Sequence, residues 1–217
     1  MQVAESTLPS RNEILAALEK KQGEEAVEKL QKANVAICGL GGLGSNIAIS
    51  LARAGVGKLI LVDFDVVDVT NLHRQQYKIN QVGMPKAEAL LKNLQEIAPY
   101  VQYEMHNEKV NAENVAGLLH GADVVCEAFD SADAKAMLVN TVLEQFPQKF
   151  LVAASGMAGF GDGNSIRTRK ITNHFYLCGD EASDVELNMG LVAPRVMLCA
   201  AHQALAVVRL ILENFKM

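Results

Sequence analysis

The run Gly39-Leu40-Gly41-Gly42-Leu43-Gly44 stands directly between a β-branched apolar stretch, Asn34–Cys38, and an amphipathic stretch, Leu43–Ala54. The spacing G-x-G-x-x-G between a strand and a helix is typical of nucleotide-binding loops, because small residues let the backbone approach a phosphate at the helix N-terminus. Asp63 follows 19 residues after Gly44, where a carboxylate can accept hydrogen bonds from ribose hydroxyls. No Lys-Ser or Lys-Thr pair closes the loop, which excludes a Walker P-loop. The pattern predicts a nucleotide site, either for NAD or for ATP, with a ligand-free turn as the remaining alternative.

Strand-like and helix-like stretches alternate along most of the chain. Strands are expected at Asn34–Cys38, Lys58–Val62, Val101–His106, Asp123–Cys126 and Phe150–Ala154. Helices are expected at Leu43–Ala54, Pro85–Ile97, Asn111–His120 and Ala132–Gln145. This order predicts an α/β fold, a Rossmann-like, doubly wound and mostly parallel sheet, in a single domain over residues 1–217.

The two ends of the chain depart from this alternation. Residues 1–32 are expected to form a helical arm, since Ser10-Arg11-Asn12-Glu13 is a capping box followed by apolar residues at helical spacing. An alternating stretch runs from Ser165 to Leu177, and the polar, acidic segment Gly179–Asn188 is expected to be an ordered loop or a mobile crossover. The apolar stretch Ala193–Glu213 predicts a final helix that either packs on the sheet or forms a dimer interface.

The composition is that of an ordinary globular protein, with 50% hydrophobic and 21% charged residues. The chain has 20 basic and 25 acidic residues, a net charge of −5, and no basic stretch, which argues against general nucleic-acid binding. Its apolar runs are expected to be too short for a membrane span of roughly 18 residues, and the N-terminus lacks the apolar core of a secretory signal. The four cysteines form no CxxC pair, as is typical of a reducing compartment. We therefore expect a cytoplasmic protein with no membrane partner.

A second stretch, Asp63-Phe64-Asp65-Val66-Val67-Asp68-Val69-Thr70-Asn71-Leu72-His73-Arg74-Gln75, favours a triphosphate over NAD. Arg74 within it and Lys86 at the start of the next helix bring two cations toward the same site. An enzyme that neutralises a triphosphate needs such cations, whereas an NAD enzyme does not. Asp130 follows the strand Asp123–Cys126 and faces the same crevice. Its carboxylate could hold Mg²⁺, which takes one or two carboxylates together with phosphate oxygens.

The combination GxGGxGS, DxDxVxxxNLxRQ and GxPK resembles the ubiquitin-activating-enzyme-like adenylyltransferases of the ThiF/MoeB family. The resemblance is strong over about residues 34–155, and the ending GLVAPRV…AAHQALAVVRLIL is most similar to the short ThiF-type proteins of thiamine biosynthesis. It implies ATP-dependent adenylation of the C-terminal glycine carboxylate of a small ubiquitin-like sulfur carrier protein (ThiS-like), with release of pyrophosphate. A molybdopterin-synthase carrier, as in MoeB-like members, would need the same adenylation site. Members of the family are usually homodimers.

The resemblance also implies roles for individual residues. The nucleotide turn is lined by Gly41, Gly42 and Gly44, and the ribose is held by Asp63. Phosphate oxygens are contacted by Asn71, Arg74 and Lys86, and Mg²⁺ is bound by Asp130. Asp65 and Gln75 lie behind these groups as second-layer positions. In many members an arginine of the partner subunit completes the site, and Arg11 is the best substitute here. The ordinary interpretation of Arg11 is a solvated residue in the first helical turn. Lys135 stands where the family often has an arginine.

The remaining candidates have simpler structural interpretations. Structural zinc is not expected, because the CxxC pairs that hold it in many relatives are absent and the five histidines show no ligand spacing. Cys178 could attack the acyl-adenylate as a thiolate, but the acidic residues after it would raise its pKa, so a buried apolar role is simpler. Arg167, Arg169 and Lys170 form either a solvated strand edge or a surface for an acidic carrier. His73 is assigned no chemistry.

Two other classes of function stay open on the sequence. An NAD(P)-dependent oxidoreductase fits the glycine loop and Asp63, but it leaves Arg74 and Lys86 unexplained and lacks a recognisable catalytic Lys-Tyr or His pair. A non-catalytic nucleotide sensor or scaffold would bind a nucleotide without turning it over.

Overall fold

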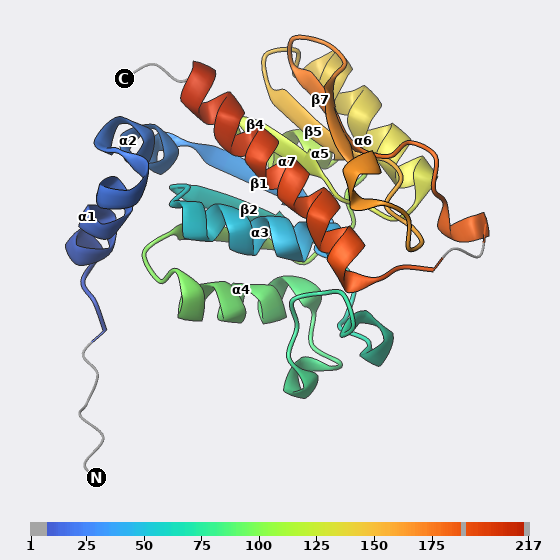
Figure 1. Cartoon of the computed structure of the whole chain (residues 1–217), viewed down its shortest axis with the longest axis horizontal. Coiled ribbons are helices and arrows are strands. Elements are labelled where there is room, and N and C mark those ends of the chain that lie inside the picture. Colours follow the sequence, from blue (N-terminus) through green and yellow to red (C-terminus); the bar gives the residue numbers. More distant parts are fainter. Residues whose placement is uncertain (1–7, 188–189, 215–217) are drawn as a thin grey trace.

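The apolar, β-branched stretches form the strands of one sheet, with the order β3-β2-β1-β4-β5-β7-β6 (Figure 1). The structure is a computed structural model that describes residues 8–187 and 190–214. The strands are β1 (Asn34–Cys38), β2 (Lys58–Val62), β3 (Gln102–His106), β4 (Val124–Glu127), β5 (Phe150–Ala154), β6 (Arg167–Lys170) and β7 (Phe175–Gly179). All pairings are parallel except that of the edge strand β6 with β7. The strand order reverses between β1 and β4, so ligands of such sheets are expected beside the end of β1.

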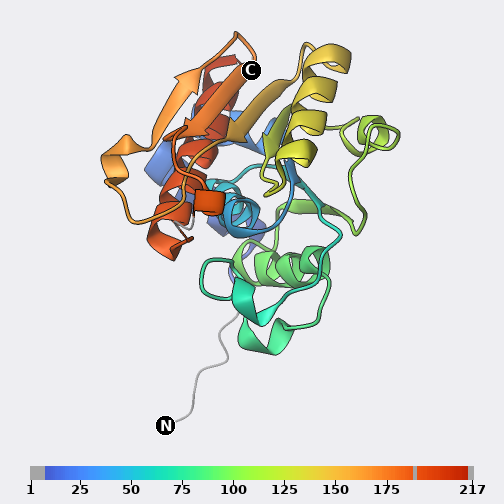
Figure 2. The same ribbon diagram turned by 90° about the vertical axis from the view of Figure 1, so that its right-hand side faces the viewer.

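Helices cover both faces of the sheet, as a doubly wound fold requires (Figure 2). One face carries α3 (Gly42–Ala54), α4 (Lys86–Ile97) and α7 (Ala193–Asn214), and the other carries α5 (Val115–Leu118) and α6 (Ala132–Gln145). Alternate side chains of β1 enter the two cores: Val35 and Ile37 face α3, whereas Ala36 and Cys38 face α6. Short 3₁₀ turns lie at Val69–Asn71, Ile79–Gln81, Gly163–Ser165 and Val185–Leu187. The predicted Rossmann-like α/β fold is confirmed.

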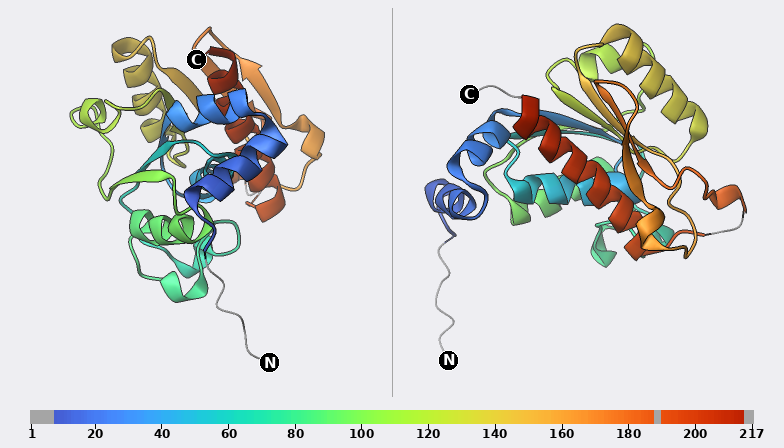
Figure 3. Two further views of the ribbon diagram at one scale, coloured as in Figure 1. Left: turned by 90° about the vertical axis from the view of Figure 1, so that its left-hand side faces the viewer. Right: turned by 45° about the horizontal axis from the view of Figure 1, so that its top comes forward.

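The N-terminal arm consists of two helices at the end of the sheet where the strands begin (Figure 3). α1 (Arg11–Gln22) starts with the predicted capping box, because Ser10 Oγ accepts the Glu13 N–H at 3.3 Å and Glu13 Oε2 accepts the Ser10 N–H at 2.8 Å. Gly23, at φ +91°, ends α1 and begins α2 (Glu24–Lys32). α2 buries two apolar residues against the domain, and a break between α1 and α2 was not predicted from the sequence. The first seven residues of the predicted arm lie outside the described residues.

The final helix contradicts the expectation that every apolar run is too short to span a membrane. α7 has 22 residues and a window of mean hydropathy 1.6, so by length and composition it is apolar enough to cross a membrane. Half of that window is buried inside the protein. Residues such as Val196, Cys199, Val207 and Ile211 belong to the core that α7 shares with α3 and the sheet. Packing on the sheet therefore accounts for much of the apolar composition of α7.

Two other segments differ from their sequence-based description. The alternating stretch Ser165–Leu177 contains two antiparallel strands, β6 and β7, separated by a turn in which Thr172 Oγ1 accepts two backbone N–H groups. The helix expected at Asn111–His120 is shorter, because Asn111 Oδ1 caps a turn at 113–114 and only Val115–Leu118 is helical. Asn188, the last residue of the expected loop, lies outside the described residues.

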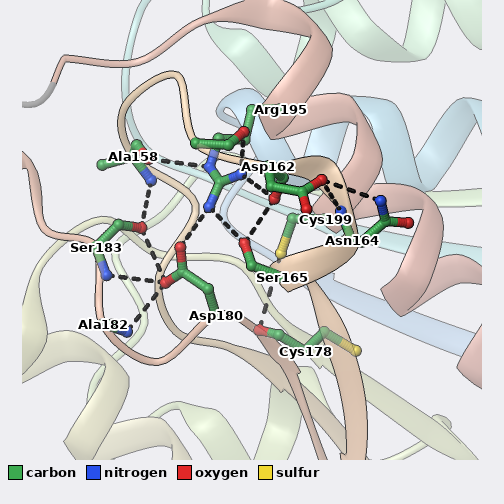
Figure 4. A network of polar contacts seen from close by, with 11 residues as sticks. Ala158, Asp162, Asn164, Ser165, Cys178, Asp180, Ala182, Ser183, Arg195 and Cys199 are labelled. Atoms are coloured by element: carbon green, nitrogen blue, oxygen red, sulfur yellow. Dashed lines mark hydrogen bonds and ion pairs between the residues drawn. The ribbon is translucent and has the colours of Figure 1, made fainter.

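A buried arginine joins the segments that surround the start of α7 (Figure 4). Arg195 donates to the carbonyls of Ala158 at 3.0 Å, Gly161 at 2.9 Å and Asp162 at 3.0 Å. It also donates to Ser165 Oγ at 3.1 Å and forms an ion pair with Asp180. All five guanidinium N–H donors thus have a partner. The network fixes the loop after β5 and the loop after β7 to the same helix end.

We expect Asp180→Ala to lower the free energy of unfolding by about 3–5 kcal/mol, because it leaves the buried Arg195 without a counter-charge. The control Glu213→Ala removes an exposed ion pair to Arg209 on the same helix and should cost at most about 1 kcal/mol. Urea unfolding measures both. Equal losses in the two variants would contradict the structural importance of the network.

The carboxylate of Asp180 also makes the stability of the protein depend on pH in the acidic range. Burial would raise the pKa of Asp180, but hydrogen bonds from the N–H groups of Ser183 and Ala182 and from the Arg195 guanidinium hold it at about 2. Because the folded pKa lies below the unfolded value of about 3.9, this contribution is present at neutral pH and is lost as the pH falls from about 4 toward 2. The penalty of Asp180→Ala should shrink over that range when unfolding is measured against pH.

Candidate functional site

The glycine loop links the end of β1 to the start of α3 at the point where the strand order reverses. Gly39 has φ +90°, and a Cβ there would lie 2.7 Å from the carbonyl oxygen of Ala128. A Cβ on Gly44 would lie 1.8 Å from the carbonyl oxygen of Gly39. These two glycines are therefore required by the fold itself, since the loop folds back on its own backbone and on the end of β4.

Gly41 differs from these glycines because the space beside it is open. The nearest atom to a Cβ there would be Gln75 Nε2 at 3.7 Å, whereas a Cβ on Gly42 would lie 2.9 Å from Val196 Cγ1. The Oε1 atom of Gln75 is buried and has no hydrogen-bond partner within the described part of the chain. A buried polar atom usually has a partner. Open space beside Gly41, together with the unpaired amide oxygen of Gln75, fits a site for a polar ligand.

Asp63 holds the loop from the end of β2 while keeping capacity to accept further hydrogen bonds. Its Oδ2 accepts the Leu40 N–H at 2.6 Å and its Oδ1 accepts the Asp65 N–H at 2.8 Å. Burial raises the pKa of Asp63, and these backbone donors oppose the shift. A carboxylate has about four acceptor positions. Two positions therefore remain for hydroxyl groups such as those of a ribose.

Tyr77 is a member of the site that the sequence analysis missed. Its hydroxyl donates to the carbonyl oxygen of Leu40 at 2.7 Å, so both backbone groups of Leu40 are held by side chains. Burial raises the pKa of this hydroxyl, which keeps it protonated as a donor. No local pattern marks Tyr77, because its contact partner lies 37 positions away in the chain.

Lys86 lies beside Asp65 at the start of α4. Its Nζ is 2.8 Å from Asp65 Oδ2, and its backbone N–H donates to the carbonyl oxygen of Asp65 at 2.8 Å. The side chain of Lys86 is only 9% exposed, whereas that of Asp65 is 47% exposed. An ammonium has three donors, so Lys86 can contact a ligand while it keeps this pair.

Arg74 is held against the glycine loop from the segment after β2. Its Cγ would be 3.5 Å from a Cβ on Gly42, and its Nη1 donates to the carbonyl oxygen of Thr70 at 3.1 Å. Burial lowers the pKa of Arg74, and the charge of the exposed Asp130 opposes this shift, so the two side chains interact electrostatically. Asn71 serves a local role here, because its Oδ1 accepts the Asp68 N–H at 3.0 Å.

Asp130 lies just beyond β4 on a turn fixed by a buried ion pair. Lys135 Nζ is 3.0 Å from Glu127 Oε1, and the same oxygen accepts the Phe129 N–H at 2.7 Å. Burial raises the pKa of Glu127, and the positive charge of Lys135 opposes it. Lys135 therefore holds the turn that presents Asp130. Among the residues that the structure describes, no group of three His, Cys, Asp or Glu side chains could hold a metal ion.

The structure does not bring Arg11 to this site within one chain. Arg11 donates to Gln31 Oε1 at 2.9 Å, and Gln31 Nε2 donates to the carbonyl oxygen of Gly55 at the far end of α3. It lines a mostly apolar cavity of about 160 Å³ together with residues of α1 such as Ile14 and Leu18. Arg11 thus lies where the strands begin, whereas the glycine loop lies where they end.

Cys178 is buried in β7 and is not exposed to solvent. Burial, rather than the acidic neighbours expected from the sequence, raises the pKa of its thiol to about 11. Asp180 and Glu181 are instead paired with Arg195 and Arg169. A thiol of this kind stays protonated at neutral pH, which favours the packing interpretation.

The basic residues of β6 form an exposed edge. Arg167, Arg169 and Lys170 are all exposed, and Arg169 forms an ion pair with Glu181 across the β6–β7 pair. His73 lies beside the site, with Nδ1 2.8 Å from the carbonyl oxygen of Thr70. His73 also contacts the backbone of the segment before α7, and its Nε2 lies 3.4 Å from Arg74 Nη1.

A glycine loop, a buried carboxylate and two cations at the switch point of a parallel sheet define a Rossmann-like protein with a nucleotide-type site. Within this class, the chain belongs to the ThiF family, whose model matches residues 14–216. The resemblance inferred from the motifs is therefore confirmed.

Individual relatives match parts of the chain. It is 40% identical over 110 residues to a sulfur carrier protein adenylyltransferase of Thermus thermophilus, a match covering 50% of this chain and 41% of the relative. It is 34% identical over 149 residues to ubiquitin-like modifier-activating enzyme 5 of Xenopus laevis, covering 63% of this chain and 37% of the relative. The chain thus spans less than half the length of these relatives.

Solved structures match nearly the whole chain. The tRNA N6-threonylcarbamoyladenosine dehydratase TcdA of E. coli, in complex with ATP, has a TM-score of 0.85 and 22% identity, with 96% of this chain and 98% of that chain covered. At this identity the likeness shows a shared fold.

Alanine substitutions at two glycines of the loop should affect stability and ligand binding separately. We expect Gly44→Ala to lower the free energy of unfolding by about 3 kcal/mol, because its Cβ would overlap the Gly39 carbonyl. Gly41→Ala should change stability by at most about 0.5 kcal/mol and weaken ATP binding at least about tenfold. Urea unfolding and calorimetric titration measure these effects. Undiminished ATP affinity in Gly41→Ala would show that no ligand uses the open space.

Proposed function

We propose that the protein uses ATP to adenylate the C-terminal glycine carboxylate of a small ubiquitin-like sulfur carrier protein and releases pyrophosphate. The observation that carries this proposal is that Arg74 lies against the glycine loop, while Lys86 pairs with Asp65 close to Asp63, the carboxylate expected to hold the ribose. Membership of the ThiF family supports it, as does the relative named as a sulfur carrier protein adenylyltransferase.

The reaction needs positioning and charge neutralisation more than proton transfer. A glycine carboxylate is ionised at neutral pH, so it attacks the α-phosphate of ATP without a general base. Asp63 orients the nucleotide through the ribose, and Gly41 leaves room for the phosphates. Arg74 and Lys86 stabilise charge on the transferring group and the departing pyrophosphate.

Magnesium fits this arrangement through Asp130. Mg²⁺ is usually held by one or two carboxylates together with phosphate oxygens, so a single exposed carboxylate beside Arg74 is a suitable protein ligand. When bound, the ion would supply further neutralisation of phosphate charge. The Glu127–Lys135 pair would keep Asp130 in place for this role.

The carrier is proposed to be ThiS-like, with thiamine (thiazole) biosynthesis as the pathway. The support is the resemblance of the segment at residues 190–212, GLVAPRV…AAHQALAVVRLIL, to ThiF-type proteins of that pathway. A molybdopterin-synthase carrier remains the alternative within the same chemistry. An NAD(P)-dependent oxidoreductase is disfavoured, because membership of the ThiF family accounts for Arg74 and Lys86 as well as for the glycine loop.

A homodimer would also give Arg11 a role that it lacks within one chain. Arg11 lies at the end of the domain remote from the glycine loop, on a helix of the N-terminal arm. We propose that it acts in the partner subunit's site. The partly exposed side of α7, with Met197 46% and Leu205 60% exposed, is a suitable surface for a second copy.

ATP–pyrophosphate exchange with Mg²⁺ and a panel of Gly-Gly-terminated carriers tests the proposal. We expect exchange with one ThiS-like carrier, lowered about 10²–10³-fold in Arg74→Ala because a cation on the transferring phosphate is lost. Lys92→Ala, which removes an exposed cation on α4, is the control and should retain full exchange.

Two outcomes would contradict the proposal. Silence of the wild type across the whole panel, with ATP still bound, would exclude carrier adenylation as the activity. Unchanged exchange in Arg74→Ala would remove this residue from the reaction. Exchange with a molybdopterin-synthase carrier alone would retain the chemistry and change the pathway.

A further inference from the structure

Two polar side chains lie on the buried face of α3, where apolar packing would be expected. Ser45 is fully buried and Asn46 is 7% exposed, on a helix that otherwise packs against α7 and the sheet. Serine and asparagine are weak helix formers, and buried polar groups are costly unless they are hydrogen-bonded. Their presence directly after the glycine loop therefore needs a specific reason.

Both side chains return to the glycine loop. Ser45 Oγ donates to the carbonyl oxygen of Gly41 at 2.6 Å, and Asn46 Nδ2 donates to the carbonyl oxygen of Gly42 at 2.6 Å. Such bonds to the residue four positions earlier are common for serine in helices. Each side chain, however, has a second partner outside the helix.

These second partners belong to the segment that carries Arg74 and Gln75. Asn46 Nδ2 also donates to the carbonyl oxygen of Arg74 at 3.2 Å, and Asn46 Oδ1 accepts Gln76 Nε2 at 2.6 Å. Ser45 Oγ accepts the backbone N–H of Gln76 at 3.1 Å. The orientation of the Asn46 amide is fixed, because a reversed amide would set its oxygen against two carbonyl oxygens.

The opposite side of Gln76 is held by α4. Asn93 Nδ2 donates to the carbonyl oxygen of Gln76 at 2.8 Å. Asn93 and Gln81 are joined by a reciprocal pair of amide hydrogen bonds of 3.0 and 2.9 Å, and both side chains are buried. Gln76 is thus bound through its N–H, its carbonyl and its side chain. We call Ser45, Asn46, Gln76 and Asn93 the amide clamp.

The amide clamp fixes the two residues that face the ligand space beside the glycine loop. Arg74 and Gln75 lie between its contacts, with the Arg74 stem against Gly42 and the Gln75 amide beside Gly41. A misplacement of about 1 Å in such groups can cost about a hundredfold in rate. Hydrogen bonds specify one position more strictly than apolar packing does, since each has a preferred direction.

We infer that Asn46 is a positioning residue, which sets Arg74 and Gln75 against the glycine loop before ATP binds. The inference rests on the proposed nucleotide site and does not depend on which carrier is adenylated. Asn46 touches no ligand in this account. It acts by preorganisation, so its loss should weaken binding through Arg74 and Gln75 rather than through a contact of its own.

A double-mutant cycle on ATP affinity tests the inference. Calorimetric titration with ATP and Mg²⁺ compares wild type, Asn46→Ala, Arg74→Ala and the double variant. We expect Asn46→Ala to weaken binding about tenfold in the wild-type background and at most about threefold when Arg74 is already absent. If Asn46→Ala fails to fold, Gln76→Met replaces it, because this substitution removes only the side-chain hydrogen bond to Asn46. Its loss of ATP affinity should be smaller than the loss expected for Asn46→Ala.

Thr141→Val is the matched control. Thr141 is also buried in a helix and donates from Oγ1 to the carbonyl oxygen four residues earlier at 2.8 Å, but it lies on α6 on the other face of the sheet. It should lower the melting temperature without changing ATP affinity. Thermal unfolding shows that each variant is folded at the titration temperature.

The outcomes separate the inference from the proposed function. The positioning role would be overturned if Asn46→Ala reduced ATP affinity by the same factor in both backgrounds, or reduced it in neither. Absence of ATP binding by the wild type would overturn it as well. The expected non-additivity together with silent pyrophosphate exchange would retain the amide clamp and refute carrier adenylation.

Discussion

The carboxylate of Asp63 is the constraint on which the site depends. It directly follows β2 and binds the Leu40 N–H at 2.6 Å, so the position of the glycine loop is set by the neighbouring strand. The Asp65 N–H, bound at 2.8 Å, then directs the chain away from the sheet, and Asp65 in turn pairs with Lys86. One buried acid thus connects the loop, the strand end and the first turn of α4. Its desolvation is tolerated because two backbone donors oppose the burial penalty.

Most of the sheet could be predicted from the sequence, because its inner strands are apolar runs bounded by turns. β1, β2 and β5 have the expected limits, and α6 begins and ends as expected. The hairpin of β6 and β7 could not be separated, since its strands are an exposed edge and its neighbour without a glycine between them. α2 was missed because it buries few residues and its limits depend on Gly23.

The residues of the candidate site could be predicted only where they lie within short sequence motifs. The glycine loop, Asp63 and the GxPK turn lie within short motifs, and the structure places them together. Tyr77 and the Lys135–Glu127 pair depend on contacts made after folding, so no spacing indicates them. Arg11 lies at the other end of the domain, and only a second subunit would bring such a residue to the site.

We propose that the site receives a triphosphate whose phosphate groups are held by the cations Arg74 and Lys86. Calorimetric titration of wild type and Lys86→Ala with ATP, AMP and NAD, at one Mg²⁺ concentration, tests it most directly. We expect ATP to bind more tightly than AMP or NAD, and Lys86→Ala to reduce the difference in affinity between ATP and AMP. Tighter binding of NAD than of ATP, or an ATP-to-AMP ratio unchanged by Lys86→Ala, would contradict it.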